Sequence, residues 1–110
     1  MKAIYRASIF AVTVALCASN AFAASGSNTG RINTMLWYEG HNGLLVRQDG
    51  MSDLGGCGRS DYFILDSQHV FFKEIYAMLL SAHLSDLQVQ ISVSDCVQGI
   101  SRITHVQIAH

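Results

Sequence analysis

The chain has 110 residues, half of them hydrophobic, and a formal net charge of −1 at pH 7. That length suits one domain. Without Lys2 and Arg6, five basic residues stand against eight acidic ones, which gives a net charge of −3. Because the affinity of proteins for nucleic acid comes largely from basic residues that neutralise phosphates, this balance argues against a nucleic-acid partner.

The first 23 residues have the pattern of a secretory signal peptide. Lys2 and Arg6 form a basic start, ASIFAVTVALCA is an apolar run, and Ala21 to Ala23 fit a cleavage site for small residues. The run is too short to span a bilayer. We predict cleavage after Ala23, which indicates a secreted or periplasmic protein with no membrane span after cleavage. An uncleaved N-terminal anchor is the alternative.

Three strands are predicted in the first half of the remaining chain. Residues 24–28 are expected to form a flexible tail, and residues 29–110 a single domain. GRINTMLWYEG predicts a first strand and LLVRQ a second, joined by the turn signal HNG. A glycine-rich loop that carries Cys57 follows. DYFILD predicts a short third strand, buried on both faces because it is almost continuously apolar.

One helix and two further strands follow. Asp66 and Ser67 are suitable N-caps for a helix that continues through FFKEIYAMLLSAHLSD. The next segment, LQVQISVSD, alternates apolar and polar residues, as a half-buried strand does. Its inward side chains are expected to be Leu87, Val89, Ile91 and Val93. After a turn with Cys96 and Gly99, ISRITHVQIAH predicts a fifth strand.

This order of elements predicts a mainly β fold, an OB-fold-like barrel of five strands with its helix between strands three and four. An unrelated α+β sandwich is the alternative. In the barrel, the start of strand three lies beside the end of strand four, which brings Cys57 and Cys96 together. Since Cys17 leaves with the signal peptide, these two cysteines are expected to form a disulfide. Free thiols or metal ligands are the other interpretation.

The predicted helix is apolar on two sides. At 100° per residue, one broad face can cover the open end of the barrel, and it comprises Phe71, Phe72, Ile75, Tyr76, Met78, Leu79 and Ala82. Leu80 and Leu84 lie elsewhere, beside the small residues Ala77 and Ser81, and we call these four residues the outer stripe. The outer stripe packs either under loops or against the same helix of a neighbouring subunit.

A resemblance rests on the helix IYAMLLSAHLS followed directly by the strand LQVQISV. In an exported OB-fold of this size, the arrangement resembles the pentameric B subunits of bacterial toxins with one A and five B subunits. It is closest to the branch that includes the subtilase cytotoxin B subunit, and it covers residues 29–93. The resemblance implies a homo-oligomer, a pentamer whose helices line a central pore. It also implies barrels that bind cell-surface glycans, and it allows a separate A subunit as a partner.

The chain also departs from that branch. There, a hydroxyl residue before the first strand and a tyrosine late in the fourth strand help to hold a sialic acid. In this sequence Thr29 stands at the first place, but Val93 stands at the second. The resemblance therefore implies a glycan ligand without specifying sialic acid.

The segment LWYEGHNG is the most ligand-like part of the chain. Trp37 and Tyr38 are neighbours in a predicted strand, so their side chains should point to opposite faces, with one of them outside. An exposed tryptophan beside Glu39, His41 and Asn42 would suit stacking on a sugar ring while polar groups bind its hydroxyls. The alternative is that Trp37 packs in the core or under a loop.

No residue pattern indicates catalysis, a metal or a cofactor. None of the five histidines is spaced from another histidine or from a cysteine as metal ligands usually are. They are His41, His69, His83, His105 and His110. No paired carboxylates stand out among the loop acids Asp49, Asp53 and Asp61. The sequence favours a non-enzymatic, self-associating, carbohydrate-binding module. The alternative is a monomeric exported protein that binds or inhibits another protein.

Overall fold

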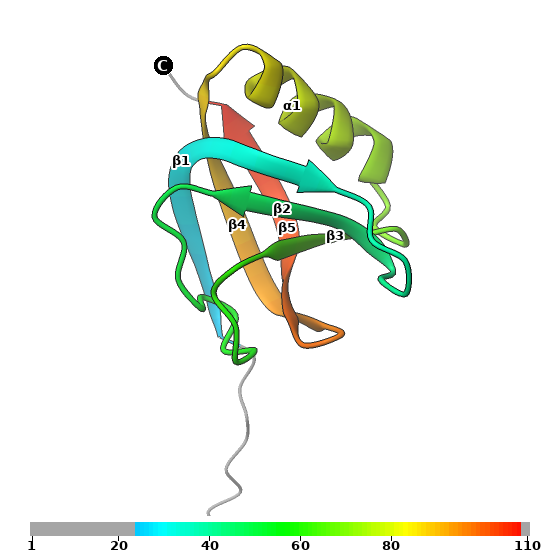
Figure 1. Cartoon of the computed structure of the whole chain (residues 1–110). Coiled ribbons are helices and arrows are strands. Elements are labelled where there is room, and N and C mark those ends of the chain that lie inside the picture. The colour runs from blue at the N-terminus through cyan, green and yellow to red at the C-terminus, as the bar shows by residue number, and fades with distance from the viewer. Residues whose placement is uncertain (1–23, 109–110) are drawn as a thin grey trace, which may run out of the picture.

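The computed structural model describes residues 24–108 as a five-stranded barrel with one helix (Figure 1). The elements are β1 (Ser25–Leu36), β2 (Gly43–Gln48), β3 (Phe63–Asp66), α1 (Phe72–Leu84), β4 (Gln88–Val97) and β5 (Ile100–Ile108). The predicted signal peptide and its cleavage site, with Cys17, lie outside the described residues, as does His110. Within the described part, no helix is long and apolar enough to cross a membrane.

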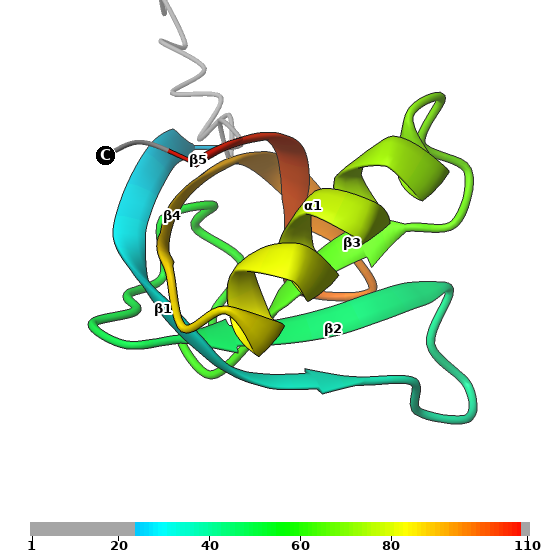
Figure 2. The ribbon, with the colours of Figure 1, turned by 90° about the horizontal axis from the view of Figure 1, so that it is seen from above.

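The sheet closes on itself in the order β1-β2-β3-β5-β4. Neighbouring strands are antiparallel except β3 and β5, which are parallel. Figure 2, a view from above, shows α1 lying across one end of the barrel. With α1 between β3 and β4, this topology confirms the predicted OB-fold-like architecture.

Strand β1 starts earlier and ends earlier than predicted. The prediction that residues 24–28 form a flexible tail was wrong, because residues 25–28 belong to β1 and pair with residues 91–94 of β4. Small polar residues join the sheet here because β4 offers them a row of backbone hydrogen-bond partners, and such context commonly outweighs strand propensity. At its other end β1 stops at Leu36.

Two apolar clusters on opposite faces of the sheet stabilise the barrel. The inner cluster fills the barrel and extends under α1: Ile32, Leu44, Val46, Phe63, Leu65, Ile75, Leu79, Ala82, Val89, Ile91, Val93 and Ile103. The outer cluster consists of Leu45, Ile64 and Ile100, with Leu36, Tyr62 and Val97 packed against it. Because β3 supplies Phe63 and Leu65 to one cluster and Ile64 to the other, the prediction that this strand is buried on both faces is confirmed.

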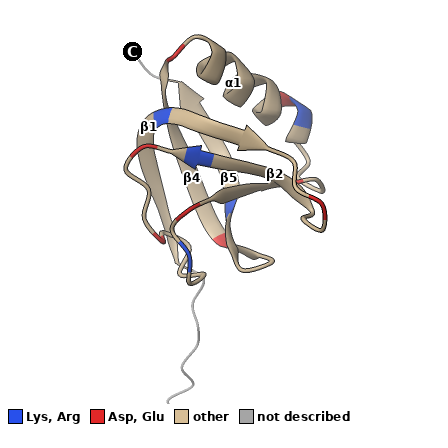
Figure 3. Ribbon diagram, viewed as in Figure 1, with Lys and Arg blue, Asp and Glu red and all other residues tan. Residues whose placement is uncertain are grey.

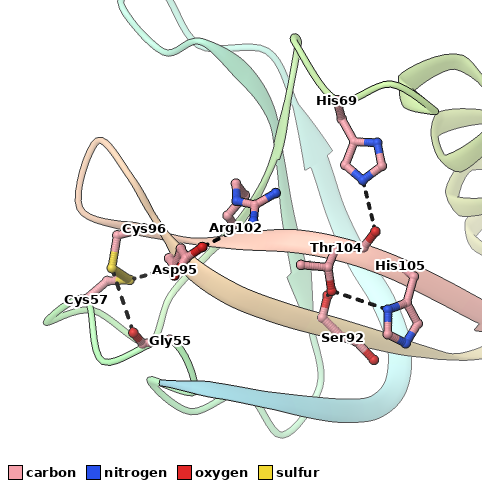
Figure 4. A network of polar contacts seen from close by, with 9 residues as sticks. All are labelled: Gly55, Cys57, His69, Ser92, Asp95, Cys96, Arg102, Thr104 and His105. Carbon is pink, nitrogen blue, oxygen red and sulfur yellow. Dashed lines mark hydrogen bonds and ion pairs between the residues drawn. A yellow bond between two sulfur atoms is a disulfide. The ribbon is translucent and has the colours of Figure 1, made fainter. Parts of the chain in front are cut away.

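The helix begins at Phe72, and the prediction that Asp66 and Ser67 cap it was wrong. Asp66 ends β3, and its carboxylate accepts the Gln68 N–H at 2.9 Å. The residue that organises the approach to the helix is His69, whose Nδ1 accepts the Phe71 N–H at 2.9 Å. Its Nε2 therefore carries the proton and donates to the Thr104 carbonyl of β5 at 2.9 Å, as Figure 4 shows.

The core face of α1 is narrower than predicted. Ile75, Leu79 and Ala82 are buried, and Phe72 and Tyr76 pack against the inner cluster. Two other predicted members are not buried, since Met78 is 36% exposed and Phe71 is 58% exposed. The reason is geometric: Met78 lies at the edge of the face, and Phe71 precedes the first helical turn.

The outer stripe lies on the side of α1 away from the barrel. Ala77 and Ser81 are exposed, Leu80 is half-buried, and Leu84 is 76% exposed. The interpretation that Leu84 packs under a loop is therefore wrong for the described residues. Whether another subunit covers this stripe stays a prediction.

The predicted disulfide between Cys57 and Cys96 is present, with the two Cα atoms 5.8 Å apart (Figure 4). Cys96 lies within β4, opposite Ser101 of β5, rather than in the turn where it was expected. The carboxylate of Asp53 accepts the N–H groups of Cys57 and Gly58, each at 2.8 Å. The disulfide thus ties an ordered loop to the end of β4.

Candidate functional site

A pocket of about 180 Å³ lies beside the outer cluster. This volume is below the range of about 300–1,000 Å³ that is typical of pockets for drug-sized ligands, so it suits a small group such as one ring. Three lining residues belong to the outer cluster, and the other three bring polar groups. The lining residues are Leu36, Leu45, Tyr62, Tyr38, His41 and Arg59.

Two loops supply the polar part of the pocket. The β1–β2 loop carries Tyr38 and His41, whose rings meet edge to face with their centroids 5.5 Å apart. The backbone N–H of His41 donates to the Tyr38 carbonyl at 3.1 Å, which closes a tight turn. The segment between Cys57 and β3 carries Arg59 and Tyr62. The pocket is therefore formed by segments that are distant in the sequence.

Tyr62 is held in a cationic environment. The guanidinium of Arg47 lies 4.6 Å from the centre of the Tyr62 ring, and that of Arg59 lies 5.9 Å from it. Arg47 also donates from Nε to the carbonyl of Asp61 at 3.2 Å. Because a cation over an aromatic face is attracted by the ring quadrupole, these contacts favour one ring orientation.

Arg59 and Asp61 form a two-pronged ion pair with both N···O distances at 2.7 Å. These hydrogen bonds from Arg59 lower the pKa of Asp61 below its ordinary value of 3.8, and they raise the pKa of Arg59. Since the carboxyl pKa is lowered in the folded state, the stabilisation is present above pH 3.8 and is lost as the pH falls further. At neutral pH, Arg59 keeps its charge at the pocket.

The ring of His41 contains an unsatisfied polar atom. Its Nδ1 is buried and has no hydrogen-bond partner among the described residues. Buried polar atoms in folded proteins are nearly always hydrogen-bonded to protein or to water. Because this atom has almost no solvent-accessible area, a ligand in the pocket could bond it only after the imidazole turns.

The structure separates the residues that the sequence grouped as ligand-binding. Tyr38 and His41 line the pocket. Trp37 does not, because its ring packs 5.7 Å from that of Phe72 at the start of α1. Glu39 and Asn42 are exposed on the same loop, and the isolated Thr29 is exposed on β1, where it pairs with Gln90 of β4.

The expectation that Trp37 and Tyr38 point to opposite faces of a strand was wrong. Trp37 is 56% exposed and Tyr38 is 62% exposed. Both follow the end of β1, so the alternation of side chains along a strand does not apply to them. The alternative that Trp37 packs in the core or under a loop is also wrong, because more than half of its surface is exposed.

Sequence reasoning missed four of the six lining residues: Leu36, Leu45, Arg59 and Tyr62. One signal was available, because the third strand was expected to be buried on both faces. Burial on the outer face requires a second apolar cluster outside the barrel, and that cluster includes Tyr62. The contribution of Arg59 depends on the path of the glycine-rich loop, for which the sequence carries no comparable signal.

The described residues hold neither a cluster of metal-ligating side chains nor a concentration of charge on one element. Among them, no three His, Cys, Asp or Glu side chains come close enough to hold a metal ion. Figure 3 shows basic and acidic residues distributed over strands, loops and α1. The absence of a cofactor and of catalysis stays a prediction.

Fold and pocket together define a small OB-fold-like domain with a ring-sized pocket on the outer side of its barrel. Comparison with protein-family models, with curated proteins and with solved structures found no match for this chain.

Proposed function

We propose that this chain is an exported, non-enzymatic binding module that takes a sugar ring in the pocket between Tyr38 and Tyr62 and self-associates through the outer stripe of α1. The observation that carries the proposal is a pocket of about 180 Å³ with aromatic walls at Tyr38 and Tyr62 and polar side chains at His41 and Arg59. Aromatic rings cover the apolar C–H faces of a sugar, while a few placed polar groups bind its hydroxyls. Arg59 and His41 would provide those polar groups.

Export and assembly are supported by separate features. The disulfide between Cys57 and Cys96 suits an oxidising compartment, as the predicted signal peptide does. Three of the four residues of the outer stripe are exposed, which suits the helix-lined ring that the resemblance to toxin B subunits implies. A glycan-binding ring of five subunits, with or without an A subunit, accounts for both surfaces.

A glycan array tests the ligand. The fluorescently labelled mature protein is expected to bind at least one immobilised glycan. Tyr38→Ala should weaken the fluorescence signal about tenfold or more because one aromatic wall is lost. His41→Ala should also weaken it. Trp37→Ala is the matched control, since it removes a neighbouring exposed aromatic ring that does not line the pocket. Its signal should match that of the parent.

Two results would contradict the proposal. One is a folded parent protein that retains no glycan. The other is a reversed pattern, in which Trp37→Ala loses the signal and Tyr38→Ala keeps it. Circular dichroism of each variant establishes that the fold is intact.

A second function has its own supporting observation. Trp37 packs against Phe72, and the two residues before Phe72 are also exposed, Val70 by 81% and Phe71 by 58%. Exposed apolar groups gathered near one helix start can mark a protein-binding surface. In a monomeric inhibitor or adaptor, Trp37→Ala and Phe71→Ala would remove binding to a partner protein, and Tyr38→Ala would not.

A further inference from the structure

The short turn between β4 and β5 reaches across to the β1–β2 loop. From this turn, Gln98 accepts the backbone N–H of Asn42 at 2.7 Å through its Oε1. Its Nε2 donates to the carbonyl of Gly40 at 2.8 Å. One side chain thus bonds two backbone groups that flank His41, a lining residue of the pocket.

The backbone conformation of Gln98 is unusual for a glutamine. Val97 pairs with Ile100, so Gln98 and Gly99 form a two-residue hairpin turn, and both have positive φ, 52° and 73°. Turns of this kind favour Asn-Gly, because asparagine tolerates the left-handed region better than longer side chains do. Glutamine is not the residue that the turn itself prefers. Its extra methylene group is what extends the amide to the β1–β2 loop.

The same hairpin holds the other wall of the pocket. Cys96, two residues before Gln98, is bonded to Cys57, and the segment after Cys57 carries Arg59 and Tyr62. One wall is therefore anchored by a covalent bond and the other by two hydrogen bonds, both from the end of β4 and its turn.

We propose that the β4–β5 hairpin positions both walls of the pocket, with Gln98 as the positioning residue for the Tyr38–His41 wall. The inference rests on the proposed function, since it assigns a role in that same pocket. A residue held in an unfavourable backbone conformation is expected where its side chain makes a needed contact. Preorganising the loop spares a ligand the cost of ordering it on binding.

Gln98→Asn separates positioning from general stability. The shorter amide suits the turn but cannot reach Gly40 and Asn42. The better turn residue offsets part of the loss of two hydrogen bonds, so the thermal midpoint should change little, while amide hydrogen exchange in residues 37–42 becomes about tenfold faster or more. Gln98→Gly, which also fits a positive φ, should likewise speed exchange in residues 37–42. Gln107→Asn, the same change at an exposed site on β5, is the control and should alter neither property.

The outcomes distinguish this inference from the proposed function. Unchanged exchange in residues 37–42 overturns the positioning role, whatever the protein binds. Faster exchange throughout the chain, with a lower thermal midpoint, also overturns it, because Gln98 would then be a general structural residue. The inference is supported if Gln98→Asn speeds exchange only in this loop and also weakens the binding signal on the glycan array. Equal glycan binding by parent and variant contradicts it. A parent that retains no glycan contradicts the proposed function, while the exchange result still decides whether Gln98 holds the loop.

Discussion

Replacing Cys57 and Cys96 together by alanine is expected to lower the free energy of unfolding by about 4 kcal/mol. The disulfide joins residues that are 39 positions apart in the sequence. A cross-link that closes a loop of this size lowers the conformational entropy of the unfolded chain, which stabilises the fold by about 4 kcal/mol. Small domains have total stabilities of about 5–15 kcal/mol, so the loss is a large fraction. Urea titrations of the parent and the double variant, followed by circular dichroism, measure the difference.

Reduction provides the control for this prediction. Dithiothreitol should lower the urea midpoint of the parent to that of the double variant and should leave the double variant unchanged. Equal midpoints for the oxidised parent and the double variant would contradict the role given to the disulfide. So would two alkylatable thiols in the unreduced exported protein.

Changing Leu80 and Leu84 together to glutamate is expected to convert an oligomer into folded single subunits. In a ring with α1 on its inner wall, the added carboxylates would lie near their copies from other subunits. Desolvation and like-charge repulsion then both oppose assembly. The core face of α1, with Ile75 and Leu79, points into the barrel and is untouched. Light scattering should give a multiple of the mature mass for the parent and a single mass for the variant.

A variant with the same added charge elsewhere is the matched control. Ser52→Glu/Ser60→Glu places two carboxylates on exposed loop positions away from α1 and should keep the parent mass. A parent that is monomeric across micromolar concentrations would falsify the ring. It would also remove most of the support for the resemblance to toxin B subunits.

The fold could be predicted from the sequence because its strands carry strong local patterns. The alternation from Leu87 to Val93 fixed the inward face of β4, and the apolar DYFILD segment indicated burial on both sides of β3. The two cysteines added an independent long-range constraint, which the disulfide confirms. Errors arose at the ends of elements, where tertiary contacts decide. Residues 25–28 form a strand because β4 lies beside them, and the approach to α1 is organised by His69 bonded to β5.

The pocket could be predicted only in part. Tyr38 and His41 were found because aromatic and polar residues gather in a turn-like segment. Arg59 and Tyr62 lie on another loop, and the disulfide and the outer cluster bring them to the pocket. Gln98 gave no signal as a residue type. Its role depends on a positive φ and on a long-range contact that only the folded chain reveals.

Chemical-shift mapping by NMR tests the central claim most directly, that a sugar ring occupies the pocket between the two loops. The ¹⁵N-labelled mature protein is titrated with a panel of monosaccharides, both neutral and acidic. At least one sugar is expected to shift, in a saturable way, the resonances of Tyr38, His41, Arg59 and Tyr62, including the imidazole nitrogens of His41. Two results would contradict binding in this pocket: shifts confined to other surfaces, or no saturable shift with any sugar that the protein binds on the array.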